Sequence, residues 1–427
     1  MNEQVLPLHE AQDGHALTEP RRRWHYVIAR HLVQRLFAGL AHGRLTISEE
    51  GFSNTYGSGA PDIHLAIHDP RAWQAFAFGG SIGAGESYMA GQWSCDDLVG
   101  LVRLLLRNRP IIDRLDSGLT GLGMPLRRIR HWFNRNSRAG SRRNIAAHYD
   151  LGNDFYRLWL DPTMMYSCAL YERADMNLHE ASVAKLEHIC STLDLRRDDH
   201  VLEIGTGWGG FALHAARCHG CRVTTVTLSQ EQHDLATERI REAGLDDRVE
   251  VRLCDYRDLD GQYDKLVSIE MIEAVGAANL GTYFRQCGRL LKPDGTMFLQ
   301  AITIADQRYE QALHEVDFIQ KHIFPGGFLP CVQALSTAMS RASDLRIVQL
   351  DDIGPHYANT LAAWRECFLA RLDEVRALGF DDRFIRMWLF YLCYCEGGFR
   401  ERDLGTVRMV LVRPAWRGQL PVRSGQA

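Results

Sequence analysis

The stretch from Val201 to Gly210 constrains the fold of this chain more than any other. An apolar run that contains Glu203 is followed by Gly205, Gly207 and Gly209, and then by a helical pattern. Glycine lets the backbone turn with positive φ and lets a ligand approach the main chain closely. Free amides at the start of the helix favour a negative group. The stretch predicts a strand, a tight turn and a helix, with a ligand at the turn.

Strand and helix patterns alternate from residue 179 onward, which predicts a parallel sheet covered by helices on both faces. A helical insertion over 357–400 separates the last two strand patterns. This order fits a doubly wound α/β sheet closed by an antiparallel edge strand, with ligands bound beyond the strand carboxyl ends. The expected strands are 200–205, 222–227, 249–253, 265–270, 296–302, 345–350 and 407–412.

Residues 1–125 predict a small α+β domain, with helices over 24–42 and 98–106 and short strands near 45–48 and 62–68. The glycine-rich patch 76–86 is expected to be a loop. Residues 126–145 are rich in arginine and contain Trp132 and Phe133. This stretch is interpreted either as a solvated linker or as a basic surface for anionic lipid headgroups.

Composition excludes several classes of protein. A net charge of −4 gives no reason to expect nucleic-acid binding, and no apolar run is long enough to span a membrane. Residues 1–20 carry no secretory signal pattern. The eleven cysteines are scattered, which indicates reduced thiols in the cytoplasm. Cys218 and Cys221 have CxxC spacing but no second pair nearby, so no metal site is predicted.

The ends of the next two strands indicate which nucleotide binds. A dinucleotide fold favours GxGxxG and an acid that ends the second strand. Here the glycines stand at alternate positions, and the second strand ends with Val226-Thr227-Leu228-Ser229. The third strand is followed by Asp255 and Tyr256, an acid and an aromatic ring suited to an adenine amino group and face. The combination favours S-adenosylmethionine over NAD.

Several further motifs, in this order, resemble the cyclopropane-fatty-acid synthase family, which includes the mycolic-acid methyltransferases. The resemblance covers residues 145–412 and continues more loosely upstream through Gly85-Glu86-Ser87-Tyr88-Met89. It implies a Rossmann-like seven-stranded S-adenosylmethionine-dependent methyltransferase sheet over 146–415. The motifs are His148-Tyr149-Asp150-Leu151-Gly152, Tyr166-Ser167-Cys168-Ala169, Gly205–Gly210, Thr227–Gln232, Ile323-Phe324-Pro325-Gly326-Gly327, Pro355-His356-Tyr357 and Cys395-Glu396-Gly397-Gly398-Phe399-Arg400.

The resemblance implies a reaction as well as a fold. A methyl group passes from S-adenosylmethionine to a cis double bond of an unsaturated phospholipid acyl chain, and a carbocation results. Aromatic faces stabilise such a cation, and a base must then remove a proton for a cyclopropane ring to close. The implied base is a bound bicarbonate.

Carried over by motif, the implied roles fall into three groups. The implied cofactor-binding residues are Tyr166, Ser167, Glu203, Gly205, Gly207, Gly209, Thr227, Gln232, Asp255 and Tyr256. The implied bicarbonate contacts are Cys168, Glu273, Gln300, Ile302 and Tyr357, where Glu273 accepts the proton of bicarbonate or orients it. The implied catalytic residues are Glu273, Tyr357, Cys168, Gln300 and Cys395, of which Cys395 is first a pocket-lining residue.

Two positions depart from the family pattern. Ala274 follows Glu273 where a histidine is usual, and Gln300 stands where the strand usually has a histidine. A glutamine can hold bicarbonate but cannot titrate, so the deprotonation step is the one affected. The alternatives are a methylene- or methyl-branched product, methylation of a sterol or small amine, or a lipid-binding protein without activity. The resemblance further implies a homodimer, and a cytoplasmic enzyme bound peripherally to the inner membrane surface.

Overall fold

The computed structural model describes residues 20–117 and 151–419. The predicted basic linker 126–145 and the motif residues His148–Asp150 therefore lie outside the described residues. The chain divides into two compact units. The first comprises Met1–Ile129, Asp317–His322 and Leu372–Asp403, and the second comprises the remainder. The predicted domain limits at 125 and 146 stay a prediction.

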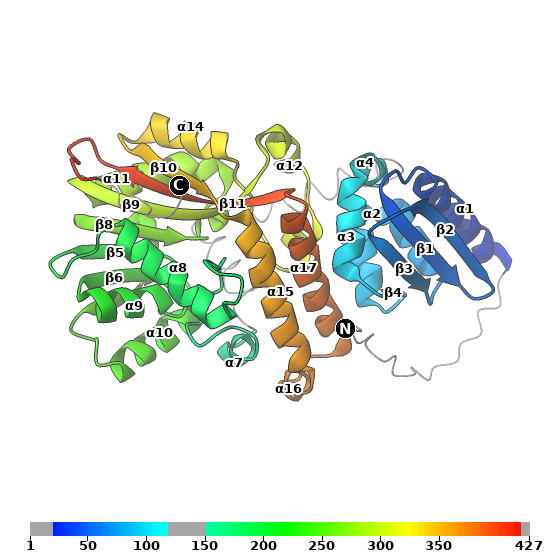
Figure 1. Ribbon diagram of the computed structural model, residues 1–427, viewed down its shortest axis with the longest axis horizontal. Coiled ribbons are helices and arrows are strands. Elements are labelled where there is room, and N and C mark those ends of the chain that lie inside the picture. The colour runs from blue at the N-terminus through cyan, green and yellow to red at the C-terminus, as the bar shows by residue number, and fades with distance from the viewer. Residues whose placement is uncertain (1–19, 118–150, 420–427) are drawn as a thin grey trace. The chain divides into compact units, whose positions relative to one another are not determined.

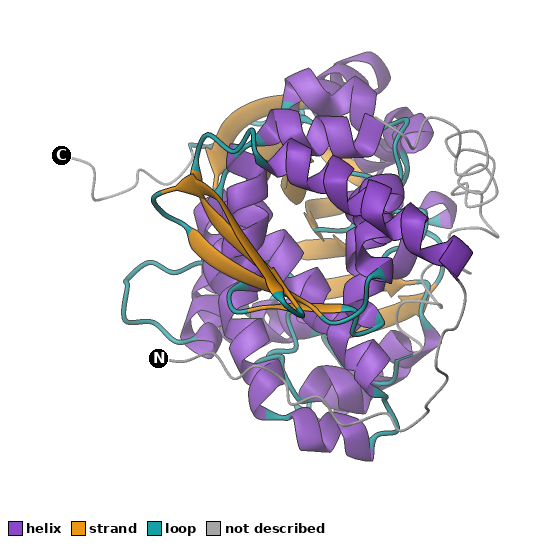
Figure 2. Cartoon of the chain, turned by 90° about the vertical axis from the view of Figure 1, so that its right-hand side faces the viewer, coloured by secondary structure: helices purple, strands orange, loops and turns teal. Residues whose placement is uncertain are grey.

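The first unit is a four-stranded sheet with helices against one face (Figure 2). Apolar side chains alternate with polar ones along β1 and β3, as in a sheet with one buried face. The strand order is β2-β1-β3-β4, and β2 was not predicted. Its elements are α1 (Pro20–Phe37), β1 (Gly43–Glu49), β2 (Phe52–Ser58), β3 (Asp62–Ile67), α2 (Arg71–Met89), β4 (Trp93–Cys95), α3 (Leu98–Arg107), α4 (Arg109–Ser117), α13 (Phe318–His322), α16 (Leu372–Ala377) and α17 (Asp382–Arg400).

The glycine-rich patch 76–86 is not a loop, so that prediction was wrong. The patch lies inside α2, which kinks at Gly80, a residue with φ 57 and ψ −146. A side chain at Gly85 would bring a Cβ within 2.4 Å of the ring of Phe318. The glycines therefore serve close packing of this helix inside the first unit.

The second unit is a seven-stranded sheet with helices on both faces (Figure 1), as predicted. The strand order is β10-β11-β9-β8-β5-β6-β7. One apolar core joins the sheet to α11 and α14, and another joins it to α8 and α9. The elements are α7 (Asn153–Arg157), α8 (Leu178–Thr192), β5 (His200–Ile204), α9 (Gly210–His219), β6 (Arg222–Thr227), α10 (Gln230–Glu242), β7 (Val249–Leu253), β8 (Tyr263–Ile269), α11 (Leu280–Leu290), β9 (Leu291–Ile304), α12 (Tyr309–Ala312), α14 (Val332–Ala342), β10 (Arg346–Asp352), α15 (Gly354–Ala370) and β11 (Leu404–Val412).

The antiparallel strand does not lie at the edge of the sheet, which corrects the predicted topology. β11 pairs antiparallel with both β9 and β10, so β10 forms one edge of the sheet and β7 forms the other. Burial explains the order: residues 406–412 of β11 are all buried, whereas burial alternates along β10. A strand buried on both faces needs neighbours on both sides, and an alternating strand tolerates an edge.

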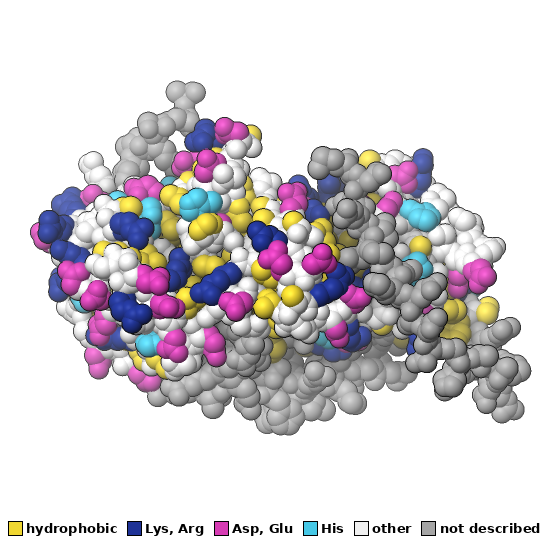
Figure 3. All heavy atoms as spheres, turned by 90° about the horizontal axis from the view of Figure 1, so that it is seen from below, with side chains coloured by type: hydrophobic (Ala, Val, Ile, Leu, Met, Phe, Trp, Pro, Cys, Tyr) yellow, Lys and Arg dark blue, Asp and Glu magenta, His cyan; other side chains and the backbone are white. Residues whose placement is uncertain are grey.

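The surface carries both signs of charge. Figure 3 shows Lys and Arg side chains interspersed with Asp and Glu on one face of the second unit, in keeping with the net charge of −4. Within residues 20–117 and 151–419, no helix is both long enough and apolar enough to cross a bilayer.

Candidate active site

The glycine turn at the carboxyl end of β5 has the predicted backbone. Gly205, Gly207 and Gly209 have φ values of 103, 51 and 82, and the amides of Gly205 and Thr206 both donate to the carbonyl of Val226. A Cβ built at Gly207 would meet nothing within 4 Å. The turn therefore presents backbone to open space at the start of α9, as a ligand site requires.

Glu203 is buried just before the turn. Its carboxyl accepts a hydrogen bond from Thr225 Oγ1 at 2.6 Å, and burial raises the pKa of Glu203 to about 8. A buried carboxyl with few protein donors has hydrogen-bonding capacity left for a ligand hydroxyl, and a bound cation would stabilise its ionised form. The site on this side fits a nucleoside ligand such as S-adenosylmethionine.

The ends of β6 and β7 hold the other predicted cofactor residues. Thr227 Oγ1 donates to the amide oxygen of Gln232 at 2.8 Å, and both residues are buried. Both oxygens of Asp255 accept hydrogen bonds from Arg257, at 2.8 and 2.5 Å. A contact between Asp255 and an adenine amino group would therefore share this carboxylate with Arg257. Tyr256, beside it, packs edge-on against Tyr283.

Tyr166 lies in a group of aromatic rings. Its ring centroid is 5.6 Å from that of Tyr156, 5.3 Å from that of Trp159 and 5.2 Å from that of Trp364. Aromatic faces attract positive charge. These rings can stabilise a sulfonium or a carbocation without attacking it.

Ser167, the neighbour of Tyr166, accepts a hydrogen bond from Lys185 Nζ at 2.7 Å. Lys185 is 1% exposed. Burial lowers the pKa of this lysine, and the nearby Glu270 opposes that shift. A buried cation is retained only near compensating negative charge.

The compensating charge is Glu270, which follows β8 and had no predicted role. Its Oε1 accepts from the backbone amide of Cys168 at 2.9 Å and from Gln300 Nε2 at 2.8 Å. Its Oε2 accepts from Tyr357 Oη at 2.7 Å. Burial raises the pKa of Glu270, while the hydrogen bonds from Tyr357 and Gln300 lower it. The donors come from three separate segments and converge on one carboxylate.

The backbone of Glu270 is unusual. Its φ is 49, in the left-handed region that a residue with a side chain adopts at a cost of about 1–2 kcal/mol. The Glu270 amide donates to the carbonyl of Gln300 at 2.8 Å, which holds this conformation. The chain thus accepts local strain to aim the carboxylate, a feature typical of functional sites.

Glu273 lies near Glu270 and accepts fewer hydrogen bonds. Its Oε1 accepts from the backbone amide of Ile302 at 2.6 Å, and its Oε2 is buried without a hydrogen-bond partner among the described residues. Burial and then the charge of Glu270 raise the pKa of Glu273 to about 8. The raised pKa favours the protonated form of Glu273 at neutral pH. The anionic form of Glu270 is stabilised by three hydrogen-bond donors and by the nearby Lys185 cation.

The contacts predicted for bicarbonate are all present, but they bind the protein itself. The Cys168 amide, Gln300 and Tyr357 donate to Glu270, and the Ile302 amide donates to Glu273. Bicarbonate does not fit these donors, because a side-chain carboxylate already occupies them.

Two predicted catalytic cysteines have different positions. Cys168 is fully buried, burial raises the pKa of its thiol, and it contributes a backbone amide. Cys395 lies on α17 in the first unit, where burial also raises its thiol pKa. A protonated thiol is a poor nucleophile and a poor base. The roles carried over for these and the other predicted residues stay predictions.

Comparisons with known proteins agree with this geometry. The sequence model of the family described as mycolic acid cyclopropane synthetase matches residues 136–409. Tuberculostearic acid methyltransferase UfaA1 of Mycobacterium tuberculosis is 42% identical over 85% of this chain and 87% of that protein. Cyclopropane-fatty-acyl-phospholipid synthase of Escherichia coli K12 is 39% identical over 84% of this chain and 91% of that protein.

Solved structures give the same result. The mycolic acid cyclopropane synthase CmaA1 complexed with SAH and CTAB has a TM-score of 0.60 and 30% identity to this chain. It aligns with 64% of this chain and 98% of its own. The cyclopropane synthase MmaA2 from Mycobacterium tuberculosis has a TM-score of 0.60 and 29% identity, over 64% of this chain and 98% of that one.

Proposed function

This chain belongs to the mycolic acid cyclopropane synthetase family, and from that membership we propose its substrate and its base. The enzyme is an S-adenosylmethionine-dependent C-methyltransferase that acts on lipid acyl chains. We propose that it methylates a cis double bond of an unsaturated phospholipid, and that Glu270 is the base that completes the reaction.

S-adenosylmethionine supplies an electrophilic methyl group on a sulfonium. In this proposal the glycine turn and Glu203 hold its nucleoside, and the rings around Tyr166 face its positive charge. An alkene has no proton to lose before it is methylated, so the enzyme needs no base at the methyl-transfer step. It needs alignment and a dry environment, which a buried aromatic group supplies.

The convergence of hydrogen bonds on Glu270 is the observation that carries the proposal. A proton must leave the added methyl group after the cation forms, and a carboxylate that is anionic at neutral pH can accept it. Donors from Cys168, Gln300 and Tyr357 fix both oxygens of Glu270. Glu273 has the raised pKa of about 8 and remains protonated, so it does not compete for the same proton.

Two products conserve atoms and charge. If the electron pair of the broken C–H bond attacks the cationic carbon, a cyclopropane ring closes. If a hydride first moves to that carbon from the methyl-bearing carbon, the positive charge passes to the methyl-bearing carbon. The electron pair of the methyl C–H bond then forms a C=CH2 double bond, which gives a methylene-branched chain. In both, Glu270 takes the proton. The ring is the first candidate and the branched chain the second.

One observation favours the second candidate. Gln300 stands where the family resemblance implies a histidine, and it holds a glutamate instead of bicarbonate. The site thus departs from the family pattern at the group that removes the proton, and the product depends on whether this removal precedes or follows the hydride shift. The similarity to a protein named tuberculostearic acid methyltransferase, at 42% identity, supports the same candidate.

The proposed substrate lies in a membrane, since phospholipid acyl chains do. The proposal therefore includes peripheral binding at the cytoplasmic membrane surface. The similarity to a cyclopropane-fatty-acyl-phospholipid synthase supports a phospholipid substrate.

Expression in a host that has cis-unsaturated phospholipids and no cyclopropane synthase tests the function. We expect acyl chains that have gained one CH2 unit, and NMR distinguishes upfield cyclopropane protons from the alkene protons of a C=CH2 branch. Expression of Glu270→Gln in the same host is the matched control and should give neither. Methylated headgroups or sterols with unchanged acyl chains would refute the proposal.

A further inference from the structure

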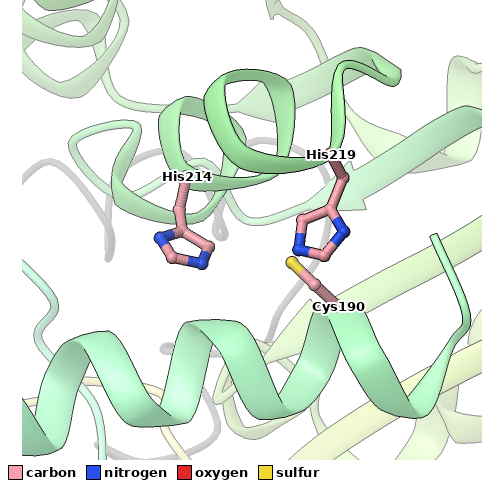
Figure 4. A group of neighbouring side chains, drawn as sticks. All are labelled: Cys190, His214 and His219. Atoms are coloured by element: carbon pink, nitrogen blue, oxygen red, sulfur yellow. The ribbon is translucent and has the colours of Figure 1, made fainter. Parts of the chain in front are cut away.

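A second group of chemically reactive side chains lies away from the glycine turn. Cys190 of α8 and His214 and His219 of α9 form one group whose ligand atoms all lie within 4.8 Å of one another. Figure 4 shows the Cys190 thiol directed at the ring of His219, with the ring of His214 beside them. α9 begins at Gly210, in the turn, and ends at His219, so the two histidines lie at the middle and at the far end of that helix.

A carboxylate completes the group. Glu187 Oε2 accepts from His214 Nε2 at 3.1 Å and from His219 Nε2 at 3.2 Å. Nitrogen and oxygen ligands at about 2.0–2.1 Å on one tetrahedral ion are about 3.3–3.4 Å apart. Both carboxylate-to-imidazole distances are thus already close to those between two ligands of one metal ion, and an ion between these atoms would replace the shared protons.

Solvent exposure increases across the group from Cys190 to Glu187. Cys190 is fully buried, the side chains of His214 and His219 are 13% and 19% exposed, and that of Glu187 is 49% exposed. A metal could enter from the Glu187 side and would meet the thiol last. Cys218 is exposed, and its sulfur lies 3.9 Å from Nδ1 of His214, the ring nitrogen opposite the one that contacts Glu187.

We propose that Cys190, His214, His219 and Glu187 form a binding site for a divalent transition metal of the Zn²⁺ type. One thiolate, two imidazoles and one carboxylate are a ligand set that zinc accepts in tetrahedral geometry. The ligands tie α8 to α9 over the apolar core that both helices share. The site is structural, and it does not depend on the proposed reaction.

Sequence spacing concealed this site. The CxxC pattern directs attention to Cys218 and Cys221, but Cys221 is buried and donates to the carbonyl of Ala215. The site instead uses His219 between those two cysteines and brings in Cys190 from the preceding helix. Only the packing of α8 against α9 joins them.

Titration of the full-length, chelator-treated protein with Co²⁺ tests the site. We expect one Co²⁺ per chain, visible bands of a tetrahedral ion, and a near-ultraviolet thiolate-to-cobalt band. His219→Gln and Glu187→Gln should each weaken Co²⁺ binding by more than about 10-fold. Cys190→Ser should remove the thiolate band, whereas Cys367→Ser, at an exposed cysteine on α15, should leave it intact.

Measurements on the unaltered protein keep the test decisive if a variant fails to fold. X-ray absorption of the Zn²⁺-loaded protein should show one sulfur and at least two imidazoles, and Zn²⁺ should raise the melting temperature. Binding that is equal in unaltered protein and His219→Gln would overturn the proposal. So would a thiolate band that Cys218→Ser abolishes, or a zinc shell without sulfur.

Discussion

At the ends of β5 and β6, hydrogen bonds join residues close in sequence, whereas around Glu270 they join residues far apart. Thr227 and Gln232 are 5 positions apart, and Glu203 and Thr225 are 22 apart. Glu270 is 102 positions from Cys168 and 87 from Tyr357. In our proposal, the first region is a local motif that binds the cofactor. The second region is assembled by the tertiary fold and supplies the base that acts on the cation.

This contrast predicts a division of effects. Changes around Glu270 should reduce turnover and leave cofactor affinity intact, and changes in the glycine turn should do the opposite. The following variants test that division, from the largest expected effect to the smallest.

Glu270→Gln should reduce kcat by about 100-fold or more, because an amide cannot accept the proton. The dissociation constant for S-adenosylmethionine should stay unchanged, as measured by calorimetry. Glu273→Gln is the matched control three residues away, and it should retain most of the activity because Glu273 is already protonated at neutral pH. Equal losses in both variants would contradict the assignment.

Tyr357→Phe removes the donor to Glu270 Oε2, and kcat should fall about 10-fold. This donor stabilises the anion, so its loss should raise the Glu270 pKa. The acid limb of the kcat profile of the unaltered enzyme should lie above the ordinary glutamate value of 4.5, because burial raises the pKa of Glu270. In Tyr357→Phe, this limb should move to higher pH. An unmoved limb would mean that another group controls it.

Gly207→Ala should weaken S-adenosylmethionine binding about 5-fold, since a residue with a side chain at φ 51 costs about 1 kcal/mol. At saturating cofactor, kcat should equal that of the unaltered enzyme. Gly244→Ala is a control at a glycine with φ 65 after α10, outside the turn. A lower kcat in Gly207→Ala would weaken the division between binding and turnover.

Glu273→Gln should change how stability depends on pH. The folded-state pKa of about 8 lies above the unfolded value of 4.5, so the folded state holds the extra proton and stability falls as pH rises between the two. From pH 6 to pH 8 this group alone costs on the order of 2 kcal/mol. Between pH 6 and pH 8, the melting temperature of Glu273→Gln should therefore fall less than that of the unaltered protein. Identical pH dependence would show that Glu273 ionises normally.

The sequence predicted the sheet well, because apolar runs and βα alternation are local properties. All seven strands of the second unit lie where expected, and the glycine turn has the expected positive φ values. The position of β11 between β9 and β10 was missed, since strand order depends on burial across the whole sheet. The sequence predicted a loop over 76–86 because composition cannot show that glycines in α2 allow close packing.

The site was predicted in part. The resemblance named Cys168, Gln300 and Tyr357, which do converge, but on Glu270 instead of bicarbonate. Two sequence features indicated a changed site. One is the pair of acids after β8, Glu270 and Glu273, and the other is Gln300 in place of histidine. Neither feature shows by itself that the Glu270 side chain points toward Cys168, Gln300 and Tyr357, because that direction depends on the left-handed backbone of Glu270.

The most direct test of the central claim compares unaltered enzyme with Glu270→Gly in buffer free of bicarbonate and in buffer with bicarbonate added. Glycine tolerates the left-handed backbone at this position and removes the carboxylate. The unaltered enzyme should turn over equally in both buffers, and Glu270→Gly should be inactive until bicarbonate occupies the vacated donors. Loss of activity in the unaltered enzyme on removal of bicarbonate would contradict the claim that its own carboxylate is the base.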